Sequence, residues 1–318
     1  MQSILFVESG LTDSDNPMST LYNLKCNKIK EKYDYFDIST ELNFDLEKYD
    51  TLILGCRSIY IYKCYKNHKK KDLLKQNFEK LMKIKNKYII LQDIHTKTYG
   101  NLDDLSEILN KNKINIIFTF FKCYEANIIR KKTPECKYFH LPHFIDTNIF
   151  NSNNCEKTID LLLYGAIHPT HYPFRKRLFD LILSNKEKFP NIMYIEKPES
   201  FDPNFCEKGL AQIINKSKFA ISTKSKYDYL VAKYLEIPAC NCIVIGDIPS
   251  DSDNELKKNI IELKNTDSDD EIIKIIKDSI QNYDNYKIKI KEYQKYIIEN
   301  YNLEKYINKL ETIIKNNK

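Results

Sequence analysis

Short apolar runs alternate with longer amphipathic stretches along most of the chain, and this alternation constrains the fold more than any other feature of the sequence. The apolar runs suit strands that are buried on both faces, and the stretches between them carry apolar residues at helical spacing. A strand–helix–strand order is typical of a parallel sheet covered by helices on both faces. We therefore expect an α/β fold.

The first half of the chain predicts one such sheet. Its strands are expected at residues 4–7, 35–38, 51–54, 88–91, 114–118 and 138–141, and its helices near residues 18–32, 69–86, 102–112 and 123–131. The polar stretch Asn151-Ser152-Asn153-Asn154 then interrupts the pattern, as a linker would. We place the first domain at residues 1–150.

The alternation restarts after this linker and predicts a second domain at residues 151–318. Its strands are expected at 160–164, 192–195, 219–222, 243–245 and 260–263, and its helices near 174–188, 205–217, 226–236 and 270–281. Residues 283–315 predict one or two terminal helices, the last of which is a candidate to pack back on the first domain. The expected fold is thus two Rossmann-like, doubly wound domains with a cleft between them. In such folds ligands bind beyond the carboxyl ends of the strands.

Composition narrows the classes of function. A hydrophobic content of 42% over 318 residues excludes global disorder. The formal charge of +6, from 50 basic and 44 acidic residues, permits a phosphate-bearing ligand and does not require nucleic acid. The densest basic run, at residues 66–71, leads into apolar residues at helical spacing, and we interpret it as a solvated helix face. We expect no nucleic-acid partner.

The cysteines and the amino terminus predict the compartment. The 9 cysteines are scattered without a CxxC pair, which favours reduced thiols over a structural zinc site or a thioredoxin-type motif. The opening residues MQSILFVESG lack the features of a signal peptide, and no apolar run approaches the roughly 20 residues that span a bilayer. We expect a cytoplasmic protein (in the host cytoplasm if the gene is viral) with no transmembrane segment, no metal and no cofactor.

A first candidate site follows the strand expected at 160–164. Gly165 makes a turn, and after a polar loop Tyr172-Pro173 opens a helix whose first turn carries Arg175, Lys176 and Arg177. The unpaired amides of a helix amino terminus attract an anion, and guanidinium groups strengthen such a site. The alternative is a surface helix whose arginines pair with nearby carboxylates.

A second candidate site, residues 222–228, follows the strand expected at 219–222. Ser222 or Thr223 could cap the next helix, and Lys224 and Lys226 could meet a phosphate. Asp228 lies eight positions before Glu236, just over two helical turns, so the expected helix would carry both carboxylates on one broad face.

Glu236 itself raises a question. Pro238 is expected to force Ile237 out of helical geometry and end the helix, which leaves Glu236 on the last turn. A carboxylate there opposes the helix dipole, at a cost of about 0.3–1 kcal/mol. Glu236 is therefore either a solvated residue or an acceptor for a bound group. The turn that follows needs a residue with positive φ, and Asn241 is the best candidate.

These stretches carry a family resemblance. The string Asp228-x7-Glu236-Ile-Pro-Ala-Cys-Asn resembles the Glu-x7-Glu element of GT-B glycosyltransferases. Residues 162–175, with Gly165 and Tyr172-Pro173-Phe174-Arg175, are similar to the spore-maturation (CgeB-like) and group 1 branch, and residues 141–150 resemble the element that closes the first domain there. The three matches occur in the family's order over roughly residues 138–250.

The resemblance implies a role for each matching position. Glu236 would accept hydrogen bonds from the ribose of a nucleotide sugar, and Asp228 would face the sugar. Arg175, with Lys224 or Lys226, would hold the diphosphate, so that no metal is needed. The chain departs from the family where Thr-Lys-Ser-Lys-Tyr replaces the glycine-rich turn, where Asp replaces the first Glu, and where Asn241 replaces Gly.

A catalytic base should come from the first domain. Asp93 and His95 follow the strand expected at 88–91, and either could take a proton from an acceptor hydroxyl, although His95 could also be a hydrogen-bonded loop residue. The turn at residues 7–10 could touch the acceptor or the sugar phosphate. His143, at the junction of the two domains, is a further candidate and could equally be a hinge residue. We expect no metal at His168 and His171.

Three classes of function follow. The first is a metal-independent glycosyltransferase that moves a sugar from a UDP- or GDP-sugar to a hydroxyl of a glycan, a protein or a small molecule. The second is a catalytically inactive GT-B-fold protein that binds or scaffolds. The third, a nucleic-acid binder, is disfavoured because the lysines are spread and are offset by 44 acidic residues.

Overall fold

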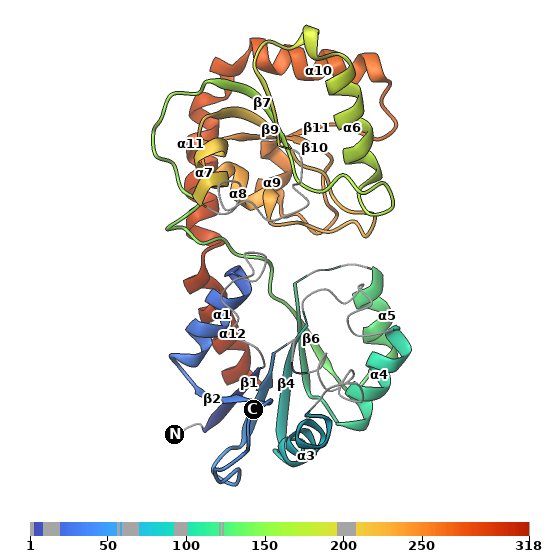
Figure 1. Ribbon diagram of the computed structural model, residues 1–318, viewed down its shortest axis with the longest axis vertical. Coiled ribbons are helices and arrows are strands. Elements are labelled where there is room, and N and C mark those ends of the chain that lie inside the picture. Colours follow the sequence, from blue (N-terminus) through green and yellow to red (C-terminus); the bar gives the residue numbers. More distant parts are fainter. Residues whose placement is uncertain are drawn as a thin grey trace. The chain divides into compact units, whose positions relative to one another are not determined.

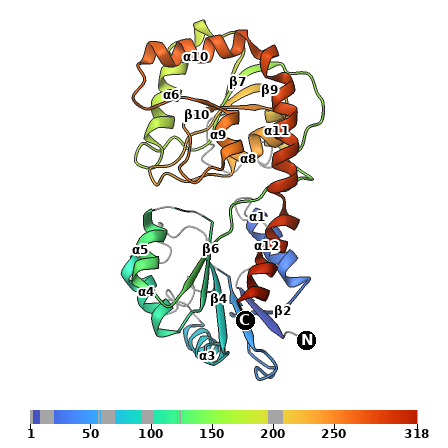
Figure 2. The same cartoon turned by 180° about the vertical axis from the view of Figure 1, so that it is seen from behind.

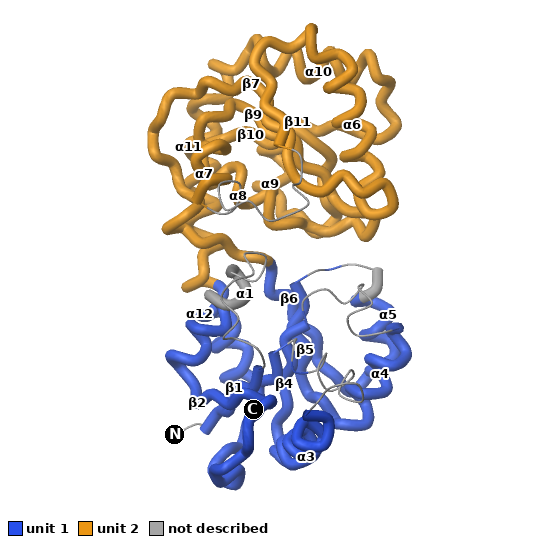
Figure 3. The backbone as a smooth tube through the Cα atoms, viewed as in Figure 1, with its two compact units in different colours: residues 1–142, 306–318 blue, residues 143–305 orange. Residues whose placement is uncertain are grey.

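The computed structural model describes residues 3–8, 20–55, 58, 70–91, 101–120, 122, 124–195 and 208–317. The chain divides into two compact units (Figure 3). Unit 1 combines Met1–Pro142 with Tyr306–Lys318, and unit 2 comprises His143–Lys305. Each unit contains one parallel sheet.

The sheet of unit 1 has six strands in the order β2-β1-β3-β4-β5-β6, all parallel. The strands are β1 (Ile4–Glu8), β2 (Asp34–Asp37), β3 (Thr51–Leu54), β4 (Asn86–Leu91), β5 (Ile116–Thr119) and β6 (Lys137–His140). Its helices are α1 (Thr20–Lys30), α3 (Lys71–Leu81), α4 (Leu102–Lys111), α5 (Tyr124–Lys132) and the later part of α12 (Leu303–Asn316). Figures 1 and 2 show α1 and α12 on one side of the sheet and α3, α4 and α5 on the other.

The four inner strands of unit 1 are buried almost throughout, whereas the edge strands β2 and β6 are partly exposed. This burial is the physical reason for their continuous apolar runs, because helices cover both faces of the sheet. The carboxyl-terminal segment completes the cover. The Tyr306 ring packs edge-on against Phe120, and the Tyr88 hydroxyl donates to the Asn317 carbonyl at 3.3 Å.

The sheet of unit 2 has five parallel strands in the order β11-β10-β9-β7-β8. The strands are β7 (Ile159–Tyr164), β8 (Ile192–Ile195), β9 (Ser217–Ile221), β10 (Ile243–Gly246) and β11 (Ile260–Glu262). The helices are α6 (Pro173–Ser184), α7 (Lys208–Asn215), α8 (Lys233–Ala239), α9 (Asn254–Asn259), α10 (Asp269–Gln281) and α11 (Lys287–Asn300), with short 3-10 turns at Lys186–Lys188 and Tyr283–Tyr286. Figures 1 and 2 show α6 and α10 on one side of the sheet and α8 and α11 on the other.

The segment that enters unit 2 lies beside the segment that leaves it. The Ile145 N–H donates to the Tyr301 carbonyl at 2.8 Å, and Ile145 forms a parallel bridge with Asn302. The hydroxyl of Tyr301 also donates to Asp253 Oδ2, whose other oxygen caps α9 through the Leu256 N–H at 2.8 Å. Hydrogen bonds therefore join the segment that enters unit 2 to the segment that leaves it, and they join the latter to Asp253 at the start of α9.

The predicted α/β fold with two doubly wound parallel sheets and terminal helices is confirmed, and every expected strand is present within a few residues. Two helices differ from prediction. Helix α9 was not foreseen, and the helix expected near residues 226–236 is instead α8, which starts only at Lys233. Among the described residues, no helix combines the length and apolarity needed to span a membrane.

Candidate functional site

Unit 2 has a topological switch point between β7 and β9. These strands are neighbours, yet the chain leaves β7 toward β8 on one side and leaves β9 toward β10 on the other. Their connections diverge at the carboxyl edge, which is where open α/β sheets bind ligands. The loops at this point contain the predicted residues of both candidate stretches.

Gly165 follows β7 directly and has a φ of +92°, a conformation that a side chain rarely adopts. A Cβ atom on Gly165 would lie 2.0 Å from Lys233 Nζ and 2.8 Å from its Cε. The backbone conformation thus requires glycine here, and a Cβ would also displace the end of the Lys233 side chain.

Arg175 ties the two loops together from the first turn of α6. Its NH1 donates to the Ala166 carbonyl at 3.0 Å, after β7, and its NH2 donates to the Thr223 carbonyl at 2.7 Å, after β9. The guanidinium carbon lies 4.1 Å from the centroid of the Tyr172 ring, and Tyr172 is the N-cap residue of the helix. The side chain is only 2% exposed, so Arg175 forms the base of the site.

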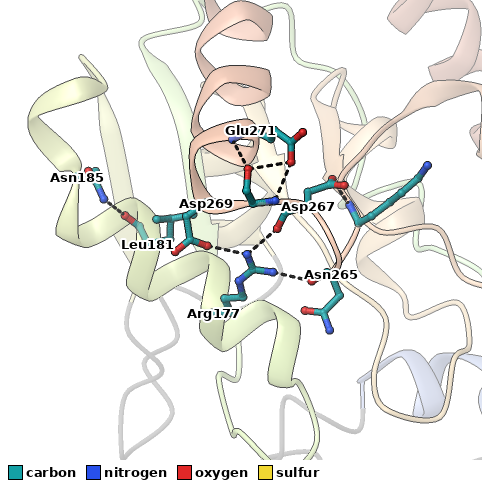
Figure 4. Close-up of polar contacts among 9 residues, drawn as sticks. Arg177, Leu181, Asn185, Asn265, Asp267, Asp269 and Glu271 are labelled. Carbon is teal, nitrogen blue, oxygen red and sulfur yellow. Dashed lines mark hydrogen bonds and ion pairs between the residues drawn. The ribbon is translucent and has the colours of Figure 1, made fainter.

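The two basic residues after Arg175 point elsewhere. Lys176 pairs with Asp180 one turn along α6. The guanidinium of Arg177 donates to the carbonyls of Asn265 and Asp267 at 2.7 Å and to Asp269 Oδ1 at 2.6 Å, beside the first turn of α10 (Figure 4). The expected anion site with three bases is therefore wrong for these two residues, because acceptors from α6 and from the approach to α10 bind both.

The loop after β9 is held by Asp247, which follows β10. Asp247 Oδ1 accepts the Lys224 N–H at 2.8 Å and the Tyr234 hydroxyl at 3.0 Å. Ser222 and Thr223 are fully buried, and their hydroxyls have no hydrogen-bond partner among the described residues. They cap no helix, contrary to prediction, because α8 begins ten residues beyond Thr223.

Asp228 is not on a helix with Glu236, so the expected shared helix face is wrong. Asp228 has a φ of +56°, and the loop around it is bonded to the loop after β10. The Leu230 N–H donates to Asp251 Oδ1 at 2.6 Å, and the Ser250 hydroxyl donates to the Asp228 carbonyl at 2.8 Å. These side chains replace the hydrogen bonds that a helix would have made.

The predicted cations of this loop occupy different surroundings. Lys224 Nζ lies 2.7 Å from Asp228 Oδ1, so both residues are engaged in an ion pair. Lys226 is exposed, its Nζ lies 5.1 Å from the centroid of the Tyr227 ring, and its N–H donates to the His171 carbonyl at 2.9 Å. Contact of either lysine with a phosphate stays a prediction.

Glu236 lies in the middle of α8, which runs through Pro238 to Ala239. The prediction that Pro238 forces Ile237 out of helical geometry and ends the helix is therefore wrong, because α8 includes both residues. Proline removes one donor from a helix, and α8 ends one residue later. The end of the helix follows prediction: Asn241 has a φ of +55°, its N–H donates to the Pro238 carbonyl, and the Cys242 N–H donates to the Ile237 carbonyl. This is a Schellman motif with asparagine in place of glycine.

Lys233 is the residue that sequence reasoning missed. Its Nζ donates to the Tyr164 carbonyl and lies 3.8 Å from the centroid of the Tyr164 ring. Lys233 is the one charged residue between Asp228 and Glu236 in the sequence. Its position within an otherwise uncharged stretch is the feature of the sequence that could have marked it as a site residue. Burial, with Arg175 nearby, holds the pKa of Lys233 well below its ordinary value. Burial raises the pKa of Glu236 to about 7, although the charge of Lys233 opposes that rise.

The predicted bases of the first domain, Asp93 and His95, lie outside the described residues, just beyond the end of β4. Of the turn at residues 7–10, Val7 and Glu8 are described. Glu8 is buried at the end of β1. The Ser58 hydroxyl donates to the Val7 carbonyl at 3.0 Å, and its oxygen lies 3.4 Å from Glu8 Oε1. The rings of His168 and His171 lie 5.2 Å apart. Across the described ranges, no group of three His, Cys, Asp or Glu side chains is placed to hold a metal ion.

No family model matches this chain, and no curated protein matches it. Solved structures do. Sucrose-phosphate synthase from Thermosynechococcus elongatus is similar at 10% identity, over 99% of both chains, with a TM-score of 0.63. The Anabaena protein HepE in complex with UDP and glucose is similar at 8% identity, over 99% of this chain and 100% of that one, with a TM-score of 0.58.

An alpha-glucosyltransferase in complex with UDP and a 13-mer DNA containing an HMU base is similar at 11% identity, over 99% of this chain and 100% of that one, with a TM-score of 0.58. Identities this low establish the fold alone. The chain therefore shares a fold of two parallel-sheet α/β units with these structures, and this is the fold that the sequence resemblance implied. Its membership of the glycosyltransferases, and of one branch of them, stays a prediction.

Proposed function

We propose that this protein is a glycosyltransferase that moves a sugar from a nucleoside diphosphate sugar to an acceptor hydroxyl without a metal. In this reaction the bond between the anomeric carbon and the diphosphate breaks, and a bond from the acceptor oxygen to that carbon forms. The proton of the hydroxyl passes to a base, for which Asp93 and His95 are the candidates. Fixed cations at the diphosphate stabilise the leaving group.

One observation carries this proposal. At the switch point of unit 2, the buried hydroxyls of Ser222 and Thr223 and the Nε of Arg175 have no hydrogen-bond partner among the described residues. Buried polar groups are normally paired, so such a cluster at the carboxyl edge of an α/β sheet indicates a site that a polar ligand completes. Glu236, on α8, has a half-buried carboxyl group, and this group supplies an acceptor for sugar hydroxyls.

The neighbours suggest which nucleotide to test first. HepE is described in complexes with UDP and with UDP-glucose. We propose a UDP-sugar as the first donor, with a GDP-sugar as the second. The acceptor classes to be tested are glycans, proteins and small molecules. DNA is added to this panel because the alpha-glucosyltransferase is described in complex with DNA. DNA also tests the prediction that this protein has no nucleic-acid partner.

The direct test is calorimetric titration with UDP and GDP, followed by an assay for hydrolysis or transfer from a panel of nucleotide sugars. We expect binding of one nucleotide, a loss of at least tenfold in affinity for Glu236→Ala, and no change for Lys176→Ala. Lys176 is a suitable control because it lies on the same helix as Arg175 and pairs with Asp180 on the surface. Failure of every nucleotide and nucleotide sugar to bind would contradict the proposal.

A second candidate function is a non-catalytic protein with the same fold. The ion pair of Lys224 with Asp228 favours it, because two residues predicted to face the donor bind one another. Binding of UDP with no turnover of any donor sugar would support this second function over the first.

A further inference from the structure

A cavity of about 450 Å³ lies at the amino edge of the sheet of unit 2. Its wall is formed by the residues just before β7 and β10, by the start of β9, and by the start of α11 with the 3-10 turn that precedes it. In a parallel sheet the two ends of the strands lie at opposite edges, so the length of the strands separates this cavity from the switch-point site. For the 6 residues of β7 that length is about 20 Å. The volume is typical of small-molecule sites.

The wall of this cavity carries more positive than negative charge. Four lysines line it against two carboxylates: Lys157, Lys218, Lys287 and Lys291 against Glu156 and Asp284. Lys218 is neutralised, because its Nζ lies 2.6 Å from Asp160 Oδ1 on β7. Lys287 is neutralised in the same way, with its Nζ 2.5 Å from Asp284 Oδ1. Among the described residues, Lys157 and Lys291 have no carboxylate within 4.0 Å of Nζ.

Lys157 is directed inward by an extended segment. Exposed and partly buried residues alternate from 154 to 159, as the side chains of a strand do, and Lys157 is one of the partly buried ones. Its Nζ donates to the Cys240 carbonyl at 3.3 Å and has no other partner in the part of the chain that the structure describes. Burial lowers its pKa. A partly buried ammonium group without a counter-ion is costly, so an anion in the cavity would be stabilised by it.

Uncharged side chains complete the wall. Asn241 follows α8 in a left-handed conformation, and its side-chain amide has no hydrogen-bond partner among the described residues. The ring of Tyr283 lies between two ammonium groups, because the Nζ atoms of Lys218 and Lys287 are each 5.6 Å from its centroid. Ile290 adds an aliphatic surface. The cavity therefore combines cations, an unpaired amide and an apolar wall.

This combination fits a small organic phosphate. Lysine binds phosphate as a point charge, and the two lysines without carboxylates match the two negative charges of a phosphate monoester. The Asn241 amide can donate a hydrogen bond to a phosphate oxygen. The Tyr283 ring and Ile290 would then contact the organic part of the molecule.

We propose that this cavity is a second ligand site, which binds the phosphate group of a small organic phosphate between Lys157 and Lys291. The site lies at the opposite edge of the sheet from the switch point, and it does not depend on the proposed function. A soluble phosphate ester and the headgroup of phosphatidic acid present the same chemical group, so both belong in the test.

The test is titration calorimetry at low ionic strength with phenyl phosphate, and with phenol as the uncharged comparison. At pH 8 phenyl phosphate carries two charges, because the second pKa of a phosphate monoester is about 6. We expect phenyl phosphate to bind and phenol not to bind. Co-sedimentation with phosphatidylcholine vesicles, with and without phosphatidic acid, tests the lipid headgroup as the source of the phosphate.

Four variants locate the binding. Lys157→Met and Lys291→Met should each weaken phenyl phosphate binding at least tenfold, because each removes one charge at the phosphate. Lys295→Met is the matched control, since Lys295 lies one turn along α11, is 76% exposed and does not line the cavity. It should match the wild type. Glu236→Ala should weaken UDP binding and leave phenyl phosphate binding unchanged. Thermal melting checks that each variant is folded, and the exposed position of Lys291 makes its variant the safer of the two.

Each result decides for or against the site. Phenyl phosphate binding that both cavity variants lose and both controls keep supports the inference, and vesicle binding lost in the same variants adds a lipid headgroup as its source. Failure of phenyl phosphate and of the phosphatidic acid vesicles to bind overturns it. Equal binding by all variants, or binding that only Glu236→Ala weakens, also overturns it. The proposed function is decided separately, by the titration of the wild type with nucleotides.

Discussion

Gly246 and Ser222 are in contact at the end of the β9–β10 pair: a Cβ atom on Gly246 would lie 1.7 Å from the Ser222 carbonyl oxygen. The clash would be with backbone, which cannot swing away as a side chain could. This contact brings Asp247, the next residue, against the loop that follows β9.

Gly246→Ala should therefore destabilise unit 2 by about 1–3 kcal/mol or more, as overpacking does in a close-packed core. Chemical denaturation followed by circular dichroism measures the effect. Gly209→Ala, within α7, is the control, and it should not lose stability because alanine is the better helix former. Equal stability of Gly246→Ala and the wild type would show that the strands can separate at this point.

Arg175→Lys tests whether the guanidinium group holds the two loops together. Lysine cannot reach the carbonyls of Ala166 and Thr223 at once, so at least one charged hydrogen bond is lost. We expect a loss of about 1.5–3 kcal/mol in the free energy of unfolding and weaker UDP binding.

The comparison for Arg175→Lys is Lys176→Ala, which breaks a surface ion pair and should change stability by less than about 1 kcal/mol. A destabilised Arg175→Lys that binds UDP with wild-type affinity would show that the arginine serves the fold alone.

The raised pKa of Glu236 should make the free energy of unfolding depend on pH. Its pKa is about 7 in the folded protein against an ordinary value of 4.5, so between these values the folded chain retains a proton that the unfolded chain has lost. The free energy of unfolding contributed by this group therefore falls as pH rises through this window. Glu236→Gln lacks this dependence, and its melting temperature relative to the wild type should rise from pH 5 to pH 8. A difference that stays constant with pH would contradict desolvation of the carboxylate.

Asn241 tests the turn into β10. Its φ of +55° strains a residue with a Cβ, although asparagine tolerates it better than most. Asn241→Gly should be as stable as the wild type or more so, and Asn241→Ala should lose about 1 kcal/mol. Thermal melting of the two variants side by side checks the order, and an alanine variant as stable as the glycine variant would refute it.

The catalytic base is tested by Asp93→Asn and His95→Gln. If one of these residues takes the acceptor proton, its replacement should lower kcat by about 10²–10⁴-fold. UDP affinity should change little in either variant, because the nucleotide is assigned to residues of unit 2. Wild-type turnover by both variants would exclude both residues as the base.

The fold could be predicted from the sequence because its strands are buried on both faces and so appear as continuous apolar runs. The Schellman motif at Asn241 could be predicted for a similar reason, since its requirement for positive φ is local. The start of α8 could not, because the bonds that keep residues 226–232 from forming a helix come from Ser250 and Asp251, beyond the next strand.

The site was predicted only in part. The approach of Gly165, Arg175 and Lys233 follows from strand order, which no local pattern contains. Lys233 resembles an ordinary solvated lysine of a helix until the fold brings it beside β7. The different surroundings of Arg175 and Arg177 were also hidden, because positions two apart in a helix face in different directions.

Residues 306–318 belong to unit 1, where Lys32 pairs with Glu311 and the Tyr88 hydroxyl bonds to the Asn317 carbonyl. The ribosome makes these residues after all of unit 2, so unit 1 is begun first but cannot be completed before unit 2 has been made. Unit 2, which is continuous in the chain, can mature while its neighbour still waits for α12. During translation unit 2 can therefore mature first, and a chain that stalls after residue 305 would carry a finished unit 2 attached to an unfinished unit 1.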